Sequence, residues 1–412
     1  MHDTSMNDIL DMIAGIMDRM TQVTRIGRIL MPGPTYLGMW ARDTGVATLG
    51  LNRLGKADLA GELLRRYWAF QITPESDPAT FIFRNKRFAS WTDTDAFRPT
   101  KEQLLQEAGA FPTCVYIQTP DFPAGTCEIY TDRADLDGIA WLIIALHDYY
   151  RATGDIDTVT ALASPVEEAL RYLWSRDQDG DHLLEQGANQ DWADILLRRG
   201  KVSYTQAVWY ACLGAAGGIF RAVGLEERSH MCLTKQAAVR GAINRVLMTP
   251  HGYFVNYRDP DDVSLRRSLD TALLVAFGVC TGEPALRVLR LLDTLEGPFG
   301  PAVMEPGYAP PDIGPAKYPP GQYQNEGIWP WITSYLALAW AKVGNQERAR
   351  EIILSLLGSD PTTVYEWVDN LNGQAHHGDF ATGAGALSWA ITEAGMAAVR
   401  SPELRRQEEK AG

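Results

Sequence analysis

Several features that identify common classes of protein are missing from this sequence of 412 residues. It contains no run of about 18 apolar residues, so we expect no membrane-spanning helix. Lys and Arg number 38 against 51 Asp and Glu, which gives a net charge of −13, and no basic cluster occurs. Because phosphate binding needs clustered positive charge, neither nucleic acid nor an anionic membrane is an expected partner.

The sequence is also poor in cysteine and has no cofactor-binding motif. Its five cysteines are odd in number, dispersed and without a CxxC pair, which favours reduced thiols over disulfides or a zinc site. The N-terminus carries acidic residues where a secretory signal needs positive charge, so we expect a cytoplasmic protein. No dinucleotide fingerprint, P-loop, or Ser or Cys nucleophile motif is present, and no cofactor is expected.

What the sequence does contain is one helical pattern after another. Apolar residues recur at the helical period and predict eleven to thirteen helices, mostly in pairs with short joints. The expected helices span 5–30, 44–54, 56–71, 134–153, 157–175, 203–223, 226–247, 268–280, 284–295, 328–343, 345–357 and 380–398.

Long, aromatic-rich loops separate these helix pairs. Loops of more than about 12–15 residues are uncommon unless they are functional, so we expect these loops to gather on one face. No linker rich in Gly or Ser divides the chain, and no 34- or 40-residue repeat supports an open solenoid of helix pairs. The prediction is therefore an all-α fold, a single domain over 1–412 built as an (α/α)6 toroid. The loops are 73–100, 110–133, 176–202, 248–267, 297–326 and 359–379.

Five short motifs in or beside these loops combine acids with aromatic rings. In the first, Trp40-Ala41-Arg42-Asp43-Thr44-Gly45, the arginine can donate to sugar hydroxyls, the aspartate can accept from them, and the tryptophan can stack on the ring. The alternative is a helix-capping Asp43 beside a surface Arg42. In the second motif, Asp135 and Asp137 precede an apolar helix, either as caps or as pocket residues.

The third motif, Gln190-Asp191-Trp192-Ala193-Asp194, lies in a loop before an apolar helix that contains Gln206. Burying a charge costs several kcal/mol unless the charge is paired or used. These two acids are therefore either solvated or helix-capping residues, or functional groups. A nearby Asp177-x-Asp179-Gly180-Asp181 run is similar to part of a calcium loop, but it lacks the later Glu, and a plain turn is favoured.

The last two motifs lie in the final third of the chain. The fourth contains Tyr323, Glu326, Trp329 and Trp331, which either pack the start of a helix or line the mouth. The fifth, Tyr365-Glu366-Trp367-Val368-Asp369 and onward to Gly373, precedes His376-His377. Two adjacent His side chains rarely face one ion, so no metal site is expected there.

Taken in this order, the motifs resemble those of the (α/α)6-barrel inverting α-glycosidases. This group includes glucoamylases, glycogen-debranching glucosidases, neutral invertases and the family 63 hydrolases of glucosylglycerate and mannosylglycerate. The resemblance rests on WxRDxG at Trp40–Gly45, on Trp-x-Asp followed by a Gly turn and a Gln-Ala-x-Trp-Tyr helix, and on a segment similar to YxNGGxWP. It also rests on a turn similar to Glu-x-aromatic-Asp ending in Gly, in which the aromatic residue here directly follows Glu366 and Val368 precedes Asp369. It extends from Trp40 to Trp389.

The resemblance implies roles for individual residues. Asp194 would be the general acid and Glu366 the general base, while Arg42 and Asp43 would bind the sugar in the −1 subsite. Two alternatives stay open. Glu326 replaces the first Gly of its segment and is a reserve base, and Asp191, three residues before Asp194, is a reserve acid. The expected substrate-binding residues are Trp40, Arg42, Asp43, Asp135, Asp137, Trp192, Gln206, Tyr323, Glu326, Trp329, Trp331 and Trp367.

The function implied is an inverting, exo-acting α-glycosidase that hydrolyses a small soluble α-glucoside or α-mannoside. Such an enzyme uses one carboxyl to protonate the departing oxygen and one to activate water. A disaccharide, or a compatible solute such as glucosylglycerate, is the expected kind of substrate. Alternatives on the same toroid are a sugar epimerase or isomerase, which would need a His pair, and a glycoside phosphorylase, which would need a basic anion pocket. A non-catalytic sugar-binding protein would not need Asp194 or Glu366. Glucose versus mannose, the leaving group and the oligomeric state are left open.

Overall fold

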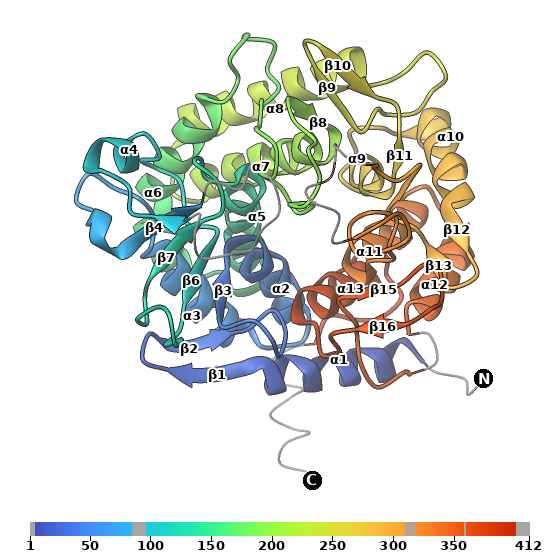
Figure 1. Cartoon of the computed structure of the whole chain (residues 1–412), viewed down its shortest axis with the longest axis horizontal. Coiled ribbons are helices and arrows are strands. Elements are labelled where there is room, and N and C mark those ends of the chain that lie inside the picture. The colour runs from blue at the N-terminus through green and yellow to red at the C-terminus, as the bar shows by residue number, and fades with distance from the viewer. Residues whose placement is uncertain (1–4, 85–95, 310–312, 314–317, 358–359, 401–412) are drawn as a thin grey trace.

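The computed structural model describes residues 5–84, 96–309, 313, 318–357 and 360–400. It shows two concentric rings of helices around a common centre (Figure 1). Each helix of the inner ring contacts the next, and the last contacts the first, so the ring is closed. The inner helices are α2 (Ala41–Arg53), α5 (Leu136–Thr153), α7 (Ser203–Ala222), α9 (Ala272–Ala276), α11 (Pro330–Lys342) and α13 (Ala381–Glu393).

Each inner helix is paired with a helix of the outer ring. Five outer helices follow their inner partners in the chain, whereas the first helix packs against α13 and completes the ring. This arrangement confirms the predicted (α/α)6 toroid. The outer helices are α1 (Met6–Met20), α3 (Ala57–Trp68), α6 (Ile156–Trp174), α8 (Glu226–Val246), α10 (Gly282–Leu292) and α12 (Gln346–Ser355).

Ring closure depends on small residues where α2 meets α13. A Cβ atom on Gly50 would lie 2.6 Å from Gly385 Cα, and a Cβ atom on Gly385 would lie 2.6 Å from Ala47 Cα. Real Cβ atoms do not approach this closely, so glycine lets the two backbones touch. One large hydrophobic cluster fills the space within and between the rings. None of the five cysteines, all of which are buried in described parts of the chain, forms a disulfide.

The long loops contain short strands that the sequence did not predict. A five-stranded sheet with the order β3-β6-β7-β4-β5 covers one side of the mouth. Its strands are β3 (Gly38–Trp40), β4 (Phe81–Arg84), β5 (Ala96–Phe97), β6 (Cys114–Tyr116) and β7 (Cys127–Ile129). The middle of the expected loop 73–100 lies outside the described residues.

The remaining strands are shorter ribbons. β8 (Lys201–Val202), β9 (Tyr257–Asp259) and β10 (Asp262–Ser264) form a three-stranded sheet. The two-stranded pairs are β1 (Thr21–Thr24) with β2 (Gly27–Leu30), β11 (Arg267–Ser268) with β14 (Met304–Glu305), β12 (Glu296–Gly297) with β13 (Gly300–Pro301), and β15 (Trp367–Val368) with β16 (Ala375–His376).

Two helix predictions need correction, and one helix was not predicted. The expected helix over 5–30 is wrong beyond Met20, because β-branched residues and the turn at Gly27, whose φ is 99°, form the β1–β2 hairpin instead. The expected helix over 268–280 is only a 3-10 turn, Leu269–Thr271, followed by the short α9. A short helix, α4 (Lys101–Leu105), was not predicted. In the described part of the chain, no helix is long and apolar enough to cross a membrane.

The order of elements brings the inner helices' N-termini to the same face. Strand β3 leads directly into α2 and β8 leads directly into α7, so the chain enters each inner helix from the loop side. Asp43 and Asp137 lie in the first turns of α2 and α5. Helix N-termini carry partial positive charge and stabilise nearby anions, which favours carboxylates at this face.

Candidate active site

A pocket with a volume of about 70 Å³ opens at the loop face of the toroid. Aromatic rings and a few charged groups line it together, a combination that is common in small-molecule sites. The lining residues come from the starts of α2, α11 and α13, from the segments before these helices, and from the loops before α5 and α7. They are Tyr36, Trp40, Arg42, Asp43, Tyr130, Trp192, Asp194, Tyr323, Gln324, Trp329, Trp331, Glu366, Phe380 and Thr382.

Arg42 and Asp43 are held rigidly in the first turn of α2. Arg42 Nε lies 2.6 Å from Asp137 Oδ2, an oxygen that also accepts a hydrogen bond from Tyr204. Asp43 Oδ1 accepts from the Thr382 hydroxyl at 2.5 Å, and burial raises the pKa of Asp43 above its usual value. The cap position of α2 is Trp40, so the alternative of Asp43 as a helix cap is wrong.

Asp194 lies half-buried in the loop between α6 and β8, in a turn that one amide side chain organises. Gln324 Nε2 donates to Asp194 Oδ1 at 3.0 Å and to the carbonyl oxygen of Trp192 at 2.6 Å, and Gln324 Oε1 accepts from the Ile195 N–H at 3.0 Å. Asn189 donates to the Asp194 carbonyl oxygen. This network orients the Asp194 carboxyl group at the pocket.

Asp191, three residues earlier, has a different environment. The guanidinium of Arg198 bonds to Asp191 at 2.7 Å and to Asp270 at 2.7 Å, and the side chains of Asp191, Arg198 and Asp270 are each only 1% exposed. Gln186 Nε2 donates to Asp191 Oδ2. Asp191 is therefore part of a buried salt bridge beneath the pocket and does not line it, which removes the reserve acid from the site.

Tryptophan and tyrosine rings form the wall beside Asp194. Trp192 packs edge-on against Trp329 at 5.5 Å and against Trp331 at 5.7 Å, and Tyr323 packs against Trp329 at 4.9 Å. The Trp192 indole donates to Asp270, and Arg198 lies over its ring. The buried salt bridge thus fixes the Trp192 ring, which lines the pocket.

Glu366 lines the same pocket, one residue before the β15–β16 hairpin. The Tyr36 hydroxyl donates to Glu366 Oε1 at 2.5 Å, and His377 Nδ1 lies 2.5 Å from Glu366 Oε2. Burial and the neighbouring carboxylate raise the pKa of Tyr36 well above its usual value, so Tyr36 keeps its proton and acts as the donor. The bond to Glu366 also raises the pKa of His377.

Five of the predicted site residues lie away from the lining of the pocket. Asp137 lies behind Arg42 as its ionic partner. Asp135 occupies the cap position of α5 without capping it, accepts from the Thr113 hydroxyl at 2.8 Å, and has its pKa raised to about 7 by burial and by the charge of Asp137.

The other three have structural partners. Gln206 is buried in α7, where its amide bonds to both the N–H and the carbonyl of Leu184. Glu326 accepts from the Gly307 N–H. Trp367 stacks on His376 with ring centroids 3.9 Å apart. Each has its polar atoms or ring committed to the protein, so none contributes to the pocket wall.

Five lining residues were missed by the sequence analysis: Tyr36, Tyr130, Gln324, Phe380 and Thr382. Tyr36 follows the helix-breaking Pro32-Gly33-Pro34 segment. Gln324 lies within the fourth motif but carries no charge, and Phe380 and Thr382 mark the start of α13. All five lie at the start of an inner helix or in the segment that leads into one, a position that becomes informative only once the ring is known.

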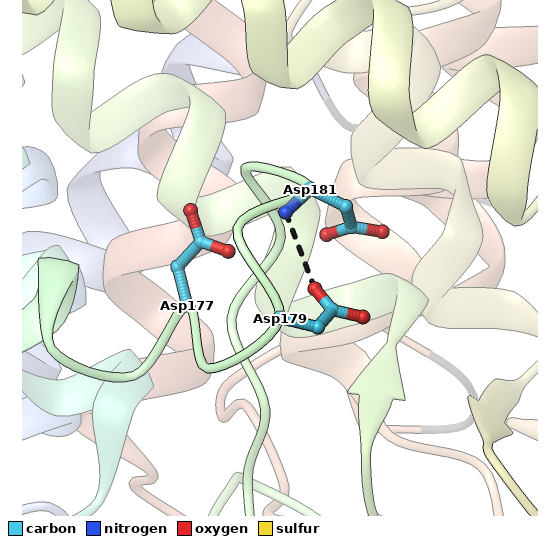
Figure 2. A group of neighbouring side chains, drawn as sticks. All are labelled: Asp177, Asp179 and Asp181. Atoms are coloured by element: carbon cyan, nitrogen blue, oxygen red, sulfur yellow. Dashed lines mark hydrogen bonds between the residues drawn. The ribbon is translucent and has the colours of Figure 1, made fainter.

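A cluster of acids lies in the loop after α6, apart from the pocket lining. Carboxylate oxygens of Asp177, Asp179 and Asp181 lie within 4.8 Å of one another (Figure 2). Lys201 Nζ lies 2.5 Å from Asp179 and 2.8 Å from Asp181, and Lys235 Nζ lies 3.0 Å from Asp177. Lysine ammonium groups therefore already supply cationic partners to all three carboxylates.

Comparison with known proteins places this pocket in context. The sequence model of the family described as amylo-alpha-1,6-glucosidase matches residues 122–371, more than half of the chain. Among solved structures, a wild-type glycosidase superposes with a TM-score of 0.67 at 14% identity, over 94% of this chain and 96% of that one. No curated protein sequence matches.

Two structures from Thermus thermophilus have the same fold. The GH63 mannosylglycerate hydrolase, in complex with Tris, gives a TM-score of 0.63 at 14% identity and covers 93% of this chain and 100% of that one. An uncharacterised conserved protein gives 0.64 at 12% identity, over 92% and 99%. At these identities the likeness concerns the fold.

Proposed function

We propose that this protein is an inverting, exo-acting α-glycosidase for small soluble α-glucosides or α-mannosides. The premise is that the chain belongs to the amylo-alpha-1,6-glucosidase family and is a glycoside hydrolase. The observation that carries this proposal is that Asp194 and Glu366 line one pocket together with Arg42 and Asp43. We take 1–412 as one catalytic domain, which the one large core cluster of the described residues supports.

In the proposed reaction, Asp194 is the general acid. It gives its proton to the departing glycosidic oxygen while the bond between that oxygen and the anomeric carbon breaks. The contacts of Gln324 orient the carboxyl group, and the rings of Trp192, Trp329 and Trp331 exclude water from it. Arg42 donates to, and Asp43 accepts from, hydroxyls of the terminal sugar, which limits the pocket to exo attack.

Glu366 is the proposed general base. It removes a proton from the water whose oxygen bonds to the anomeric carbon from the face opposite the leaving group, so the anomeric configuration inverts. Tyr36 and His377 support this role, because donors to a carboxylate favour its ionised form. Glu366 as a whole is only 1% exposed, so little bulk water reaches its side chain.

The charges of the pocket bear on the leaving group. Among the described residues that line it, Arg42 is the one cation, and it is already paired with Asp137, whereas Asp43, Asp194 and Glu366 are acids. A carboxylate on the leaving group would therefore meet like charge. We expect neutral disaccharides to be better substrates than glucosylglycerate, although both belong in a test panel.

A proton NMR time course tests the proposal. The wild-type protein and Asp194→Asn are incubated with small α-glucosides, including an α-1,6-linked disaccharide and glucosylglycerate, and with the matching α-mannosides. We expect early release of the β-anomer by the wild type and its loss in the variant. The sugar that is released also distinguishes glucose from mannose.

Other results would point elsewhere. Early release of an α-anomer would mean retention and would remove the inverting mechanism. A requirement for phosphate would indicate a phosphorylase, and interconversion of a free sugar would indicate an epimerase or isomerase. Equal cleavage by wild type and Asp194→Asn would show that another residue protonates the leaving group.

A further inference from the structure

His377 joins the buried carboxylate of Glu366 to the protein surface. The Glu366 side chain is 2% exposed, whereas that of His377 is 46% exposed, and His377 Nδ1 lies 2.5 Å from Glu366 Oε2. The backbone N–H of Glu366 donates to the carbonyl oxygen of His377 at 3.0 Å, so main chain and side chain join the same two residues. Among the described residues, His377 is the one group able to carry positive charge that bonds to this carboxylate.

The backbone at His377 is held in an uncommon conformation. Its φ is 51° and that of Asp379 is 58°, in the left-handed region that non-glycine residues seldom adopt. Such conformations cost energy and persist where the surrounding structure holds them. Here Arg19 of α1 bonds to both oxygens of Asp379, at 2.8 and 2.6 Å, and the Thr363 hydroxyl accepts from the Asp379 N–H. The outer ring thus anchors the turn that presents the imidazole.

We propose that His377 is a positioning residue for the reaction, which holds Glu366 ionised and aligned for its attack on water. This inference rests on the proposed function and assigns a residue that lies outside the pocket lining. The Nδ1–H donates to Oε2, the Tyr36 hydroxyl donates to Oε1, and the two bonds together fix the plane of the carboxylate. Each oxygen keeps a further lone pair for the proton of water.

The charge of the imidazole adds an effect that depends on pH. Coupling between two sites is reciprocal, so a carboxylate that favours the imidazolium is itself kept ionised by that imidazolium. The bond to Glu366 raises the pKa of His377, so the ring carries charge over more of the acidic range. Other titratable groups face the pair and oppose or modify this effect. They are Tyr36, Asp43, Tyr318, Tyr323 and His376.

Three variants separate these contributions. His377→Ala removes both the bond and the charge, and His377→Asn keeps a donor without the titrating ring. His376→Phe is the matched control, because it removes the adjacent imidazole and keeps a ring stacked on Trp367. All are measured for kcat, KM and the pH dependence of kcat/KM on the substrate that the NMR panel identifies, after thermal unfolding confirms that each is folded.

We expect His377→Ala to lower kcat by about 10- to 100-fold with KM within about threefold, since a hydrogen bond to a charged group is lost. The acidic limb of kcat/KM should move to higher pH, because the variant has no imidazolium beside the proposed base. His377→Asn should recover most of kcat, with its acidic limb between those of wild type and His377→Ala. His376→Phe should match the wild type in kcat, and its acidic limb should lie closer to that of the wild type than to that of His377→Ala.

A second measurement does not depend on turnover. NMR titration of the histidine rings should show a lower pKa for His377 in Glu366→Gln than in the wild type. If the wild type hydrolyses a substrate of the panel but His377→Ala leaves kcat and the acidic limb unchanged, the role of His377 is overturned while the proposed function stands. An unchanged His377 titration in Glu366→Gln would do the same. If the wild type hydrolyses nothing in the panel, the proposed function fails, and this inference with it.

Discussion

In the turn at 191–198, the buried guanidinium of Arg198 bonds to Asp191, whereas Asp194 accepts from the neutral amide of Gln324. In the β15–β16 hairpin, the carboxylate of Glu366 itself receives the phenol of Tyr36 and the imidazole of His377. In the first region Arg198 neutralises Asp191, the acid three residues before Asp194, and Asp194 itself lies beside aromatic rings. The second supplies donors to the carboxylate that faces the pocket.

This difference suits the two catalytic roles of a glycosidase, the general acid and the general base. Pairs of carboxyl groups divide into acid and base when their environments differ, with apolar surroundings favouring the protonated form and donors favouring the ionised one. Trp192 of the loop between α6 and α7 packs with Trp329 and Trp331 from the start of α11 beside Asp194. The donors to Glu366 are His377, from the loop between α12 and α13, and Tyr36, from the segment before β3. The proposed assignment of acid and base is based on this difference in surroundings.

Replacing each carboxyl group by its amide tests this assignment with the largest expected effect. Asp194→Asn and Glu366→Gln should each lower kcat on natural glycosides by roughly 10²–10⁴-fold. On the matching glycosyl fluoride, whose leaving group needs little protonation, Asp194→Asn should recover activity and Glu366→Gln should not. Steady-state rates on both substrates provide the measurement.

Glu326→Gln is the matched control for the base. Glu326 accepts from the Gly307 N–H and does not line the pocket, so its kcat should fall by less than about tenfold. A loss as large as that of Glu366→Gln would assign the role of general base to Glu326 instead. Recovery of Glu366→Gln, rather than Asp194→Asn, on the fluoride would exchange the two roles.

The buried salt bridge beneath Asp194 should matter for stability. Asp191→Asn leaves part of the Arg198 charge uncompensated, and breaking a buried pair costs about 3–5 kcal/mol in the free energy of unfolding. Denaturant unfolding measures this loss. Asp179→Asn is the control, because its pair with Lys201 is at the surface and should contribute no more than about 1 kcal/mol. Equal losses would show that the network under the pocket carries no special weight.

Tyr36→Phe tests the donor side of the comparison. The substitution keeps the ring that packs edge-on against Trp40 and removes the hydroxyl that donates to Glu366. A hydrogen bond to a charged group contributes about 1.5–3 kcal/mol, so kcat should fall by about 10- to 100-fold with little change in KM. A rise in KM at unchanged kcat would instead make Tyr36 a binding residue.

Asp135→Asn tests the pH dependence of folding. Burial raises the pKa of Asp135 to about 7, so the folded state keeps its proton while the unfolded chain has lost it. Between about pH 4 and 7 the folded state therefore binds more protons, and stability falls as pH rises, by at most about 1.4 kcal/mol per pH unit from this group. Unfolding midpoints of wild type and variant should diverge over this range, with the variant favoured at the higher pH. Parallel curves would contradict the raised pKa.

Much of the fold was predictable because its signals are local. The helix expected over 56–71 is confirmed as Ala57–Trp68, since the spacing of its apolar residues is a property of the helix segment alone. The expected helix over 5–30 failed where a β-hairpin takes over, because pairing of Thr21–Thr24 with Gly27–Leu30 is decided between two segments rather than within one. The same holds for the five-stranded sheet, whose strands of two to four residues carry too little pattern to be read alone.

The site was predictable in part for a similar reason. Arg42, Asp43, Trp192 and Asp194 belong to motifs that are contiguous in sequence, and all four line the pocket. Gln206 belongs to such a motif but points to the Leu184 backbone, because helix rotation decides which face each residue presents. Sequence proximity placed these residues near the mouth without deciding which side chains would line the pocket.

The amino-acid sequence by itself determined the helices, the positions of the long loops and the kinds of residue that those loops bring to the mouth. The tertiary structure alone decided the partners. Tyr36 reaches Glu366 across 330 residues, and Thr382 reaches Asp43 across 339, because α13 closes the ring against α2. Helix formation depends on neighbours along the chain, whereas the environment of a carboxyl group depends on which distant side chains the closed ring brings to it.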